Sequence, residues 1–246
     1  MNLTIDIGNS SVKIGCFTNG PEPDAFRRVA HDEWLAVAQS LRPAHAIVSS
    51  VTEDAATWAS WLSGMAKTVL VLGHALPLPF ANRYQTPRTL GTDRLAGVAG
   101  AQALFPGRSC LVVDAGTCLK FEWLENGSDY WGGSISPGLR MRFQAMHQFT
   151  SRLPLLEPAA DAPLTGGSTA EAMQSGVLHG MTAEIEGMVA QYRTQHPGLR
   201  VLLTGGDAPF FEKRLFETRL KTPIFAVSEL VATGLNHILN FNLQST

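Results

Sequence analysis

The 246-residue sequence lacks the short signatures of the commonest nucleotide-binding and hydrolytic enzymes. No two glycines lie two positions apart, which excludes the dinucleotide-binding pattern G-x-G-x-x-G, and no segment fits the P-loop pattern G-x-x-x-x-G-K-[ST]. The nucleophile-elbow pattern G-x-S-x-G is also missing. Any nucleotide chemistry in this chain must therefore use another scaffold.

The chain is also poor in soft metal ligands. It has three cysteines, none of them in a C-x-x-C pair, and its seven histidines never fall at zinc-ligand spacing. Cys16, Cys110 and Cys118 all lie in segments that read as strands. We expect three reduced thiols in a reducing cytosol rather than a disulfide framework or a zinc site.

Neither charge nor hydropathy indicates a nucleic-acid or membrane partner. The 19 Lys and Arg residues face 21 Asp and Glu residues, so no bulk positive charge is available for nucleic acid or an anionic membrane. No apolar run reaches the roughly 18 residues of a membrane span, and Asp6 stands where a signal peptide would be apolar. With 45% hydrophobic residues, we expect a soluble, cytoplasmic protein with a large core.

One pattern occurs twice. Residues 3–17 read as a strand, an Asp-x-Gly turn and a second strand, and residues 111–124 repeat that order. The pairs that match are Asp6 with Asp114, Gly8 with Gly116, and Asn9 with Thr117. The repeat predicts an α/β protein with an N-terminal half over 1–108, a C-terminal half over 109–246, and a ligand cleft between them.

Between these hairpins, the hydrophobic pattern predicts further strands and helices. The expected strands cover 44–51, 67–73 and 223–228, and a further strand in 200–207 ends in a Gly-Gly turn. The expected helices cover 32–41, a segment after residue 51 with Trp58, Trp61 and Leu62 on one side, 93–105, 139–147, 169–192 and 229–241. Residues 75–91 carry several prolines and show no period. A loop of that length in a compact domain is usually functional.

The Asp-x-Gly turns contain residues suited to binding phosphate groups and Mg²⁺. Small residues let backbone N–H groups approach phosphate oxygens, and Asp6 could organise a hydrated Mg²⁺ that bridges those oxygens. Gly205-Gly206-Asp207 closes a strand and opens a helix, which suits a nucleotide. A plain hairpin is the alternative for any one such turn, because Asp and Gly are common turn formers.

Five motifs, in this order and spacing, resemble one family. They are DIGNSSVK (6–13), GTDR (91–94), DAGT (114–117), GGSISPG (132–138) and TGGD (204–207). Over nearly its whole length the chain looks like a type III pantothenate kinase, of the superfamily of actin, sugar kinases and heat-shock chaperone ATPases. That resemblance implies duplicated ribonuclease-H-like halves, the actin-like ATPase fold, with ATP held between them.

The resemblance also implies roles for particular residues. The residues implied to contact ATP are Asp6, Ile7, Gly8, Asn9, Ser10, Ser11, Val12, Lys13 and Thr117. Those implied to contact pantothenate are Tyr84, Gly91, Thr92, Asp93, Arg94 and Thr169, the last of them at or near a dimer interface. Asp93 is the implied proton acceptor, Asp6 the implied Mg²⁺ residue acting through water, and Asp114 the implied ligand of a monovalent cation, K⁺ or NH₄⁺.

Several of these residues have simpler readings from the sequence alone. Asp93 could be a helix N-terminal acid, Lys13 a solvated strand residue, and Tyr84 an ordinary loop aromatic. Gly132-Gly133 and Pro137-Gly138 could bracket a turn into the helix at 139–147, or shape the active site and the dimer.

The resemblance implies ATP-dependent phosphorylation of pantothenate by a homodimer that needs Mg²⁺ and a monovalent cation, as the first step of coenzyme A synthesis. One alternative is another small-molecule kinase of the same fold, since fold does not fix substrate. A nucleotide-binding regulatory module without turnover is the other. Tyr84 followed by GTDR favours the pantothenate kinase over the former, and the presence of all three acids Asp6, Asp93 and Asp114 argues against the latter.

Overall fold

The computed structural model describes residues 1–8, 11–50, 55–216 and 223–244. They form two compact units. Unit 1 comprises Met1–Arg108, Leu124–Trp131 and Glu229–Thr246, and unit 2 comprises Ser109–Trp123 and Gly132–Ser228. None of the helices in the described ranges is both long and apolar enough to cross a membrane.

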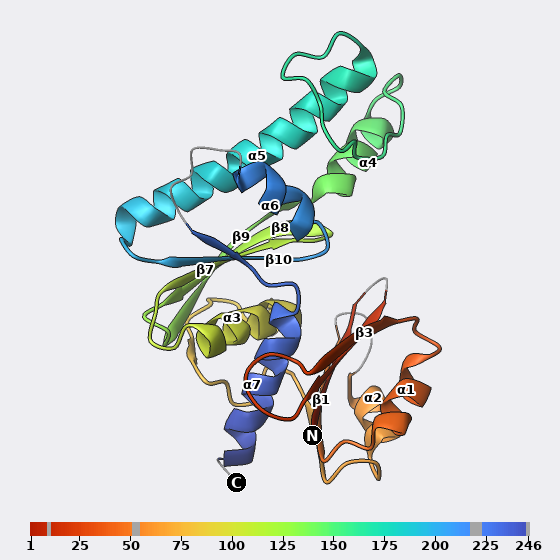
Figure 1. Cartoon of the computed structure of the whole chain (residues 1–246), viewed down its shortest axis with the longest axis vertical. Coiled ribbons are helices and arrows are strands. Elements are labelled where there is room, and N and C mark those ends of the chain that lie inside the picture. Colours follow the sequence, from red (N-terminus) through yellow and green to blue (C-terminus); the bar gives the residue numbers. More distant parts are fainter. Residues whose placement is uncertain (9–10, 51–54, 217–222, 245–246) are drawn as a thin grey trace. The chain divides into compact units, whose positions relative to one another are not determined.

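The elements follow one another along the chain in an α/β order (Figure 1). They are β1 (Asn2–Ile7), β2 (Val12–Phe17), β3 (Ala25–Val29), α1 (Trp34–Leu41), β4 (His45–Ser50), α2 (Ala55–Leu62), β5 (Thr68–Val71), β6 (Ala81–Asn82), the 3₁₀ turn η1 (Pro87–Thr89), α3 (Thr92–Leu104), β7 (Cys110–Ala115), β8 (Cys118–Glu125), β9 (Asp129–Pro137), α4 (Leu139–Phe149), α5 (Thr169–Gln195), β10 (Arg200–Thr204), α6 (Ala208–Phe216), β11 (Ile224–Ala226) and α7 (Leu230–Gln244).

Unit 1 is built on a five-stranded sheet in the order β3-β2-β1-β4-β5. β1 is antiparallel to β2 and parallel to β4. Because side chains alternate along a strand, Leu3, Ile5 and Ile7 join one core cluster with residues of α1 and α2. Helices α3 and α7 contact the strands of the same sheet, and Figure 1 shows them side by side.

The closing helix α7 packs against α3 through glycines. A Cβ at Gly234 would overlap the carbonyl oxygen of Ala96, and a Cβ at Gly100 would overlap that of Leu230. A Cβ at Gly15 in β2 would lie 3.2 Å from the Cβ of Ala232. Small residues therefore let α7 lie close to both α3 and the sheet, so the last helix of the chain completes the core of unit 1.

Unit 2 contains the parallel strands β11, β10 and β7, followed by β8 and β9 in the same sheet. One large hydrophobic cluster fills this unit, and it includes Leu111 and Val113 of β7 with Phe143 of α4 and Ile185 of α5. α5 contacts β7, α4 and α6. The long helix and its neighbours thereby bury one face of the sheet.

Three strands depart from the sequence-based expectation: β9, β3 and the two-residue β6, which lies inside the loop expected at 75–91. Gly132-Gly133 and Pro137-Gly138 were expected to bracket a turn, but residues 132–137 belong to β9, and Gly138 is the N-cap of α4 with an extended backbone. A Cβ at Gly133 would overlap the backbone of Phe121, so this glycine serves close approach between strands rather than a turn. β3 was not expected, because its sequence AFRRV is largely exposed and does not alternate.

Candidate functional site

The first Asp-x-Gly hairpin joins β1 to β2. Asp6 is paired in register with Lys13, whose Nζ lies 3.1 Å from Asp6 Oδ2, and the Asp6 side chain is only 6% exposed. The N–H of Gly8 donates to the carbonyl oxygen of Ser11 at 3.1 Å. Asn9 and Ser10 lie outside the described residues. The described part of the hairpin thus combines a buried acid, a lysine and the Gly8–Ser11 backbone hydrogen bond.

A direct link joins this hairpin to the GTDR segment within unit 1. Asp6 of β1 is the register partner of Ser49 of β4. The Oγ of Ser49, which is fully buried, donates to Thr92 Oγ1 at 2.9 Å. Thr92 immediately precedes Asp93. The pairing of β1 with β4 therefore places Asp6, near the end of β1 in the first hairpin, beside the start of α3.

The GTDR segment is the N-terminus of α3. Gly91 is the N-cap, without a side-chain capping bond, and Asp93 lies in the first turn. A Cβ at Gly91 would come 2.5 Å from Asp93 Oδ1, so a larger residue there would move the carboxylate. Asp93 is half-buried, whereas Arg94 is only 7% exposed.

Tyr84, from the loop before α3, contacts Arg94 of the GTDR segment. The Arg94 guanidinium carbon lies 5.3 Å from the centroid of the Tyr84 ring. Tyr84 in turn stacks on Tyr130, with ring centroids 6.4 Å apart and planes 12° apart. The structure therefore brings together the predicted residues Tyr84, Gly91, Thr92, Asp93 and Arg94.

Arg83, next to Tyr84, ties the same loop to β9. Its Nε donates to Asp129 Oδ1 at 2.8 Å, and β6 pairs in parallel with Asp129 and Tyr130. Hydrogen bonds from Ser128 and Arg83 hold the pKa of Asp129 below its ordinary value. The loop at 75–91 is thus anchored to β9 by the residues that directly precede Tyr84.

The second hairpin, in unit 2, joins β7 to β8. The N–H of Gly116 donates to the carbonyl oxygen of Cys118 at 3.0 Å, and Thr117 at the tip is exposed. Lys120 Nζ lies 2.8 Å from Asp114 Oδ2. The carboxylate that the resemblance assigns to a monovalent cation therefore holds the ammonium group of a lysine.

The Gly-Gly turn follows β10 in unit 2. Gly205 has φ +99°, and the N–H of Asp207 donates to the carbonyl oxygen of Ala115 at 2.9 Å. Burial raises the pKa of the Asp207 carboxyl, and Arg140, 3.2 Å away, opposes that rise. The turn leads directly into α6, as the sequence indicated.

Thr169 is the first residue of α5 and is exposed. The helix is capped by Ser168, whose Oγ accepts from the N–H of Glu171 at 3.2 Å. Thr169 belongs to unit 2, whereas Tyr84 and the GTDR segment belong to unit 1.

Two cofactor expectations can be compared with the donors present. Within the described ranges, no group of three or more His, Cys, Asp or Glu residues could hold a metal ion. Mg²⁺ keeps several waters and binds through one or two carboxylates together with substrate phosphates, so Asp6, whose Oδ2 is paired with Lys13, would hold Mg²⁺ through a water and not directly. A resident K⁺ or NH₄⁺ at Asp114 does not fit, because Lys120 already occupies that carboxylate.

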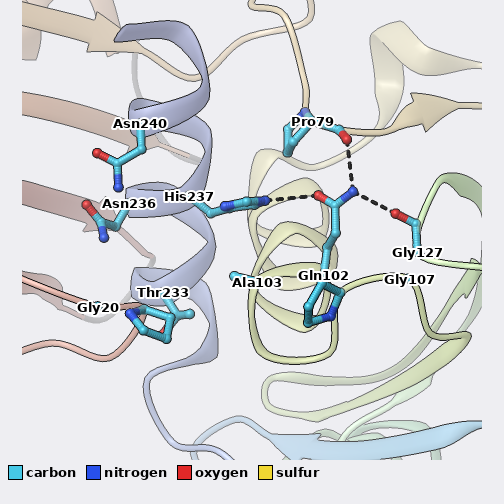
Figure 2. Close-up of a pocket in the computed structure, with 12 residues that line it drawn as sticks. Gly20, Pro79, Gln102, Ala103, Gly107, Gly127, Thr233, Asn236, His237 and Asn240 are labelled. Atoms are coloured by element: carbon cyan, nitrogen blue, oxygen red, sulfur yellow. Dashed lines mark hydrogen bonds between the residues drawn. The ribbon is translucent and has the colours of Figure 1, made fainter. Parts of the chain in front are cut away.

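A separate pocket of about 590 Å³ lies in unit 1, at the far end of α3 from Asp93 (Figure 2). Gln102 Nε2 donates to the carbonyl oxygens of Pro79 and Gly127, so its Oε1 faces His237 Nε2, 3.1 Å away. The Gln102 amide and the His237 imidazole are therefore hydrogen-bonded to each other. Within the described part of the chain, none of the predicted site residues lines this pocket.

The sequence analysis missed three residues of these clusters. Ser49 was part of an expected buried strand, and Tyr130 lay in a segment with no assigned role. Lys120 had a visible signal, because a lysine follows each hairpin acid at a similar distance, Lys13 after Asp6 and Lys120 after Asp114.

Comparison with solved structures shows the fold. A Baf family protein from Campylobacter jejuni matches with a TM-score of 0.63 at 21% identity, over 98% of this chain and 99% of that one. The activator of 2-hydroxyisocaproyl-CoA dehydratase from Clostridium difficile matches with a TM-score of 0.53 at 12% identity, over 100% and 97%. An inorganic polyphosphate/ATP-glucomannokinase from an Arthrobacter species gives 0.50 at 16% identity, over 98% of each chain. The chain has the actin-like fold of sugar kinases and ATPases.

Sequence comparison shows the family. The family model described as type III pantothenate kinase matches residues 2–191. The type III pantothenate kinase of Cytophaga hutchinsonii is 44% identical, over 99% of this chain and 100% of that protein, and the one from Phocaeicola vulgatus is 41% identical, over 98% and 99%. The match runs through both hairpins, the Tyr84–Arg94 cluster and the start of α5, and the chain belongs to the type III pantothenate kinase family.

Proposed function

We propose that this protein transfers the terminal phosphoryl group of ATP to the primary hydroxyl of pantothenate, forming 4'-phosphopantothenate, the first step of coenzyme A synthesis. The observation that carries the proposal is the link from Asp6 through Ser49 to Thr92 and Asp93. It brings the hairpin that begins at Asp6, on the sheet of unit 1, next to the half-buried carboxylate of Asp93 at the start of helix α3. Family membership supplies the substrate.

In the proposed reaction, the pantothenate hydroxyl oxygen attacks the γ-phosphorus while the bond to the bridging oxygen of ADP breaks. Asp93 orients the hydroxyl and accepts its proton late, as the new O–P bond forms. A carboxylate is too weak a base to make an alkoxide beforehand, and a loose phosphoryl-transfer transition state does not require one. Positioning and charge neutralisation then supply most of the rate enhancement.

Tyr84, Gly91, Thr92 and Arg94 hold pantothenate in this proposal. Arg94 offers a fixed guanidinium, since its side chain is buried and lies over the Tyr84 ring. Arginine binds carboxylates well because its planar group can donate two parallel hydrogen bonds. Thr169 at the exposed start of α5 is a further proposed contact, donated by the partner subunit.

The hairpin from Asp6 to Lys13 holds the ATP phosphates, and Thr117 contacts the nucleotide. Mg²⁺ would neutralise phosphate charge when bound, with Asp6 ordering its water ligands. Lys13, already 3.1 Å from Asp6, adds a positive charge at the same place. No step of this proposal passes through a bound K⁺ or NH₄⁺.

We also propose that the enzyme is a homodimer that works in the cytoplasm. α5 supports the dimer, because Ala172, Gly176 and Gly180 form an exposed row and a Cβ on either glycine would meet nothing within 4 Å. A second helix could approach such a row closely.

All three cysteines are free thiols, which is compatible with a reducing compartment. The halves 1–108 and 109–246 are proposed to be duplicated ribonuclease-H-like halves, and the matched pairs Asp6–Lys13 and Asp114–Lys120 support this proposal.

The activity is tested by following ADP release from ATP and Mg²⁺ with pantothenate, glucose or acetate as acceptor. We expect release with pantothenate alone, and its loss in Asp93→Asn but not in Asp32→Asn, an exposed acid of the same unit. Release with glucose or acetate, or none with pantothenate, would contradict the proposal. Light scattering of the same sample reports the dimer.

A further inference from the structure

The second hairpin contains a close ion pair that the established family features leave without a role. Lys120 on β8 reaches back across the turn, and its ammonium lies 2.8 Å from Asp114 Oδ2 at the end of β7. The side chains are only 14% and 22% exposed. Both partners come from adjacent strands of unit 2, so their separation is set by the sheet and not by a flexible loop.

The other oxygen of Asp114 faces backbone. A Cβ at Gly205 would come 2.5 Å from Asp114 Oδ1, and a Cβ at Gly116 would come 3.3 Å from it. Gly205 has φ +99°, a conformation that favours glycine. Gly116 of the hairpin turn and Gly205 of the Gly-Gly turn therefore both lie close to Oδ1, and Lys120 pairs with Oδ2.

A lysine ammonium and a bound K⁺ or NH₄⁺ carry the same positive charge, and both bind a carboxylate oxygen. Two such cations at one carboxylate oxygen repel each other, and the repulsion is weakly screened because both side chains are mostly buried. The tethered ammonium also needs no ion from solution. It is therefore the stronger occupant of this carboxylate.

We infer that Lys120 is a built-in monovalent cation, which takes at Asp114 the place that the family resemblance gives to K⁺ or NH₄⁺. The inference about turnover rests on the proposed kinase activity: the enzyme should work equally well in sodium or tetramethylammonium salts. The inference about ion binding does not depend on that activity.

Ion binding is tested by thermal unfolding of wild type, Lys120→Met and the control Lys213→Met in KCl, NH₄Cl, NaCl and tetramethylammonium chloride at equal concentration. Lys213 is an exposed lysine of the same unit. Wild type and the control should show no rise in Tm specific to K⁺ or NH₄⁺. Lys120→Met should gain one, because an ion that binds only the folded state raises its stability. A K⁺-specific rise in wild type, or none in Lys120→Met, would overturn the inference.

Turnover is measured on the same proteins. Lys120→Met should lose at least about tenfold in sodium salts, the scale of a charged hydrogen bond, and recover in KCl or NH₄Cl, while wild type stays unchanged across salts. Activation of wild type by K⁺ would overturn the inference. Absence of pantothenate-dependent turnover in wild type would refute the proposed function and leave the Tm comparison to decide the ion site. If Lys120→Met does not fold, Lys120→Gln replaces it. Thallium NMR then measures whether Tl⁺ binds to wild type. Tl⁺ binding would overturn the inference, and its absence would support it.

Discussion

The guanidinium of Arg94 lies over the ring of Tyr84, 5.3 Å from its centroid. The pair joins the first turn of α3 to the loop before it, and the Tyr84 ring also stacks on Tyr130. A buried, stacked guanidinium has little freedom to move, so it is suited to recognising an anionic substrate.

Replacing Arg94 with lysine should weaken pantothenate binding more than catalysis. Lysine keeps the charge but loses the planar fork and the stacking on Tyr84. We expect KM for pantothenate to rise by roughly 3- to 30-fold, the scale of a cation–π contact, with kcat and the KM for ATP nearly unchanged. Steady-state kinetics with each substrate varied in turn will measure this. Arg88→Lys, an exposed arginine of the same loop, is the control, and an equal effect there would contradict the assignment.

Asp93→Asn should lower kcat by about 10²- to 10⁴-fold, as expected for loss of a general base. The amide keeps the shape of the side chain, so ATP affinity and Tm should stay near the wild-type values. Equilibrium binding of a fluorescent ATP analogue and single-turnover kinetics separate the two effects. A variant that keeps wild-type kcat would show that Asp93 is only a helix N-terminal acid.

Gly234→Ala should destabilise the protein. The added methyl group would overlap the carbonyl oxygen of Ala96 and lie 2.6 Å from the Gly100 nitrogen. Overpacking typically costs about 1–3 kcal/mol, or a Tm decrease of roughly 2–4 °C per kcal/mol. Gly187→Ala on α5 is the matched control, because a Cβ there meets nothing within 4 Å, and it should stabilise by up to about 1 kcal/mol. Equal Tm changes in both variants would refute the close packing of α7 on α3.

Stability should fall in mild acid because of His237. Burial lowers the pKa of this imidazole, so the unfolded chain binds its proton first as the pH falls. The stabilisation is therefore complete above the ordinary histidine pKa of about 6.5 and declines below it, toward the lowered value. Urea unfolding between pH 7.5 and 5 should show a smaller pH dependence in His237→Asn than in wild type. The exposed His74→Asn should keep the wild-type slope.

Much of the fold and part of the site could be predicted from the sequence. The two hairpins are local patterns, and α3 and α5 have clear starts. Tyr84 and Arg94 could be grouped only through the family resemblance, and the structure brings them together. Ser49 and Tyr130 were missed because their contacts depend on which strands pair, β1 with β4 and β6 with β9.

The pairing of Lys120 with Asp114 was also missed, because it too depends on how the strands pair. Strand register and the length of the turn decide whether a lysine faces the acid or the opposite side of the sheet, since a shift of one residue reverses the face. β3 was missed for another reason: its exposed, charged sequence has no hydrophobic alternation.

The most direct test of the proposed activity is to identify the product formed from ATP, Mg²⁺ and pantothenate. Phosphorus–proton correlation NMR distinguishes the primary hydroxyl of pantothenate from its secondary one. We expect a single product, with phosphorus coupled to the methylene beside the gem-dimethyl carbon, formed by wild type and not by Asp93→Asn. Phosphate on the secondary hydroxyl, or consumption of ATP with no phosphorylated pantothenate, would contradict it.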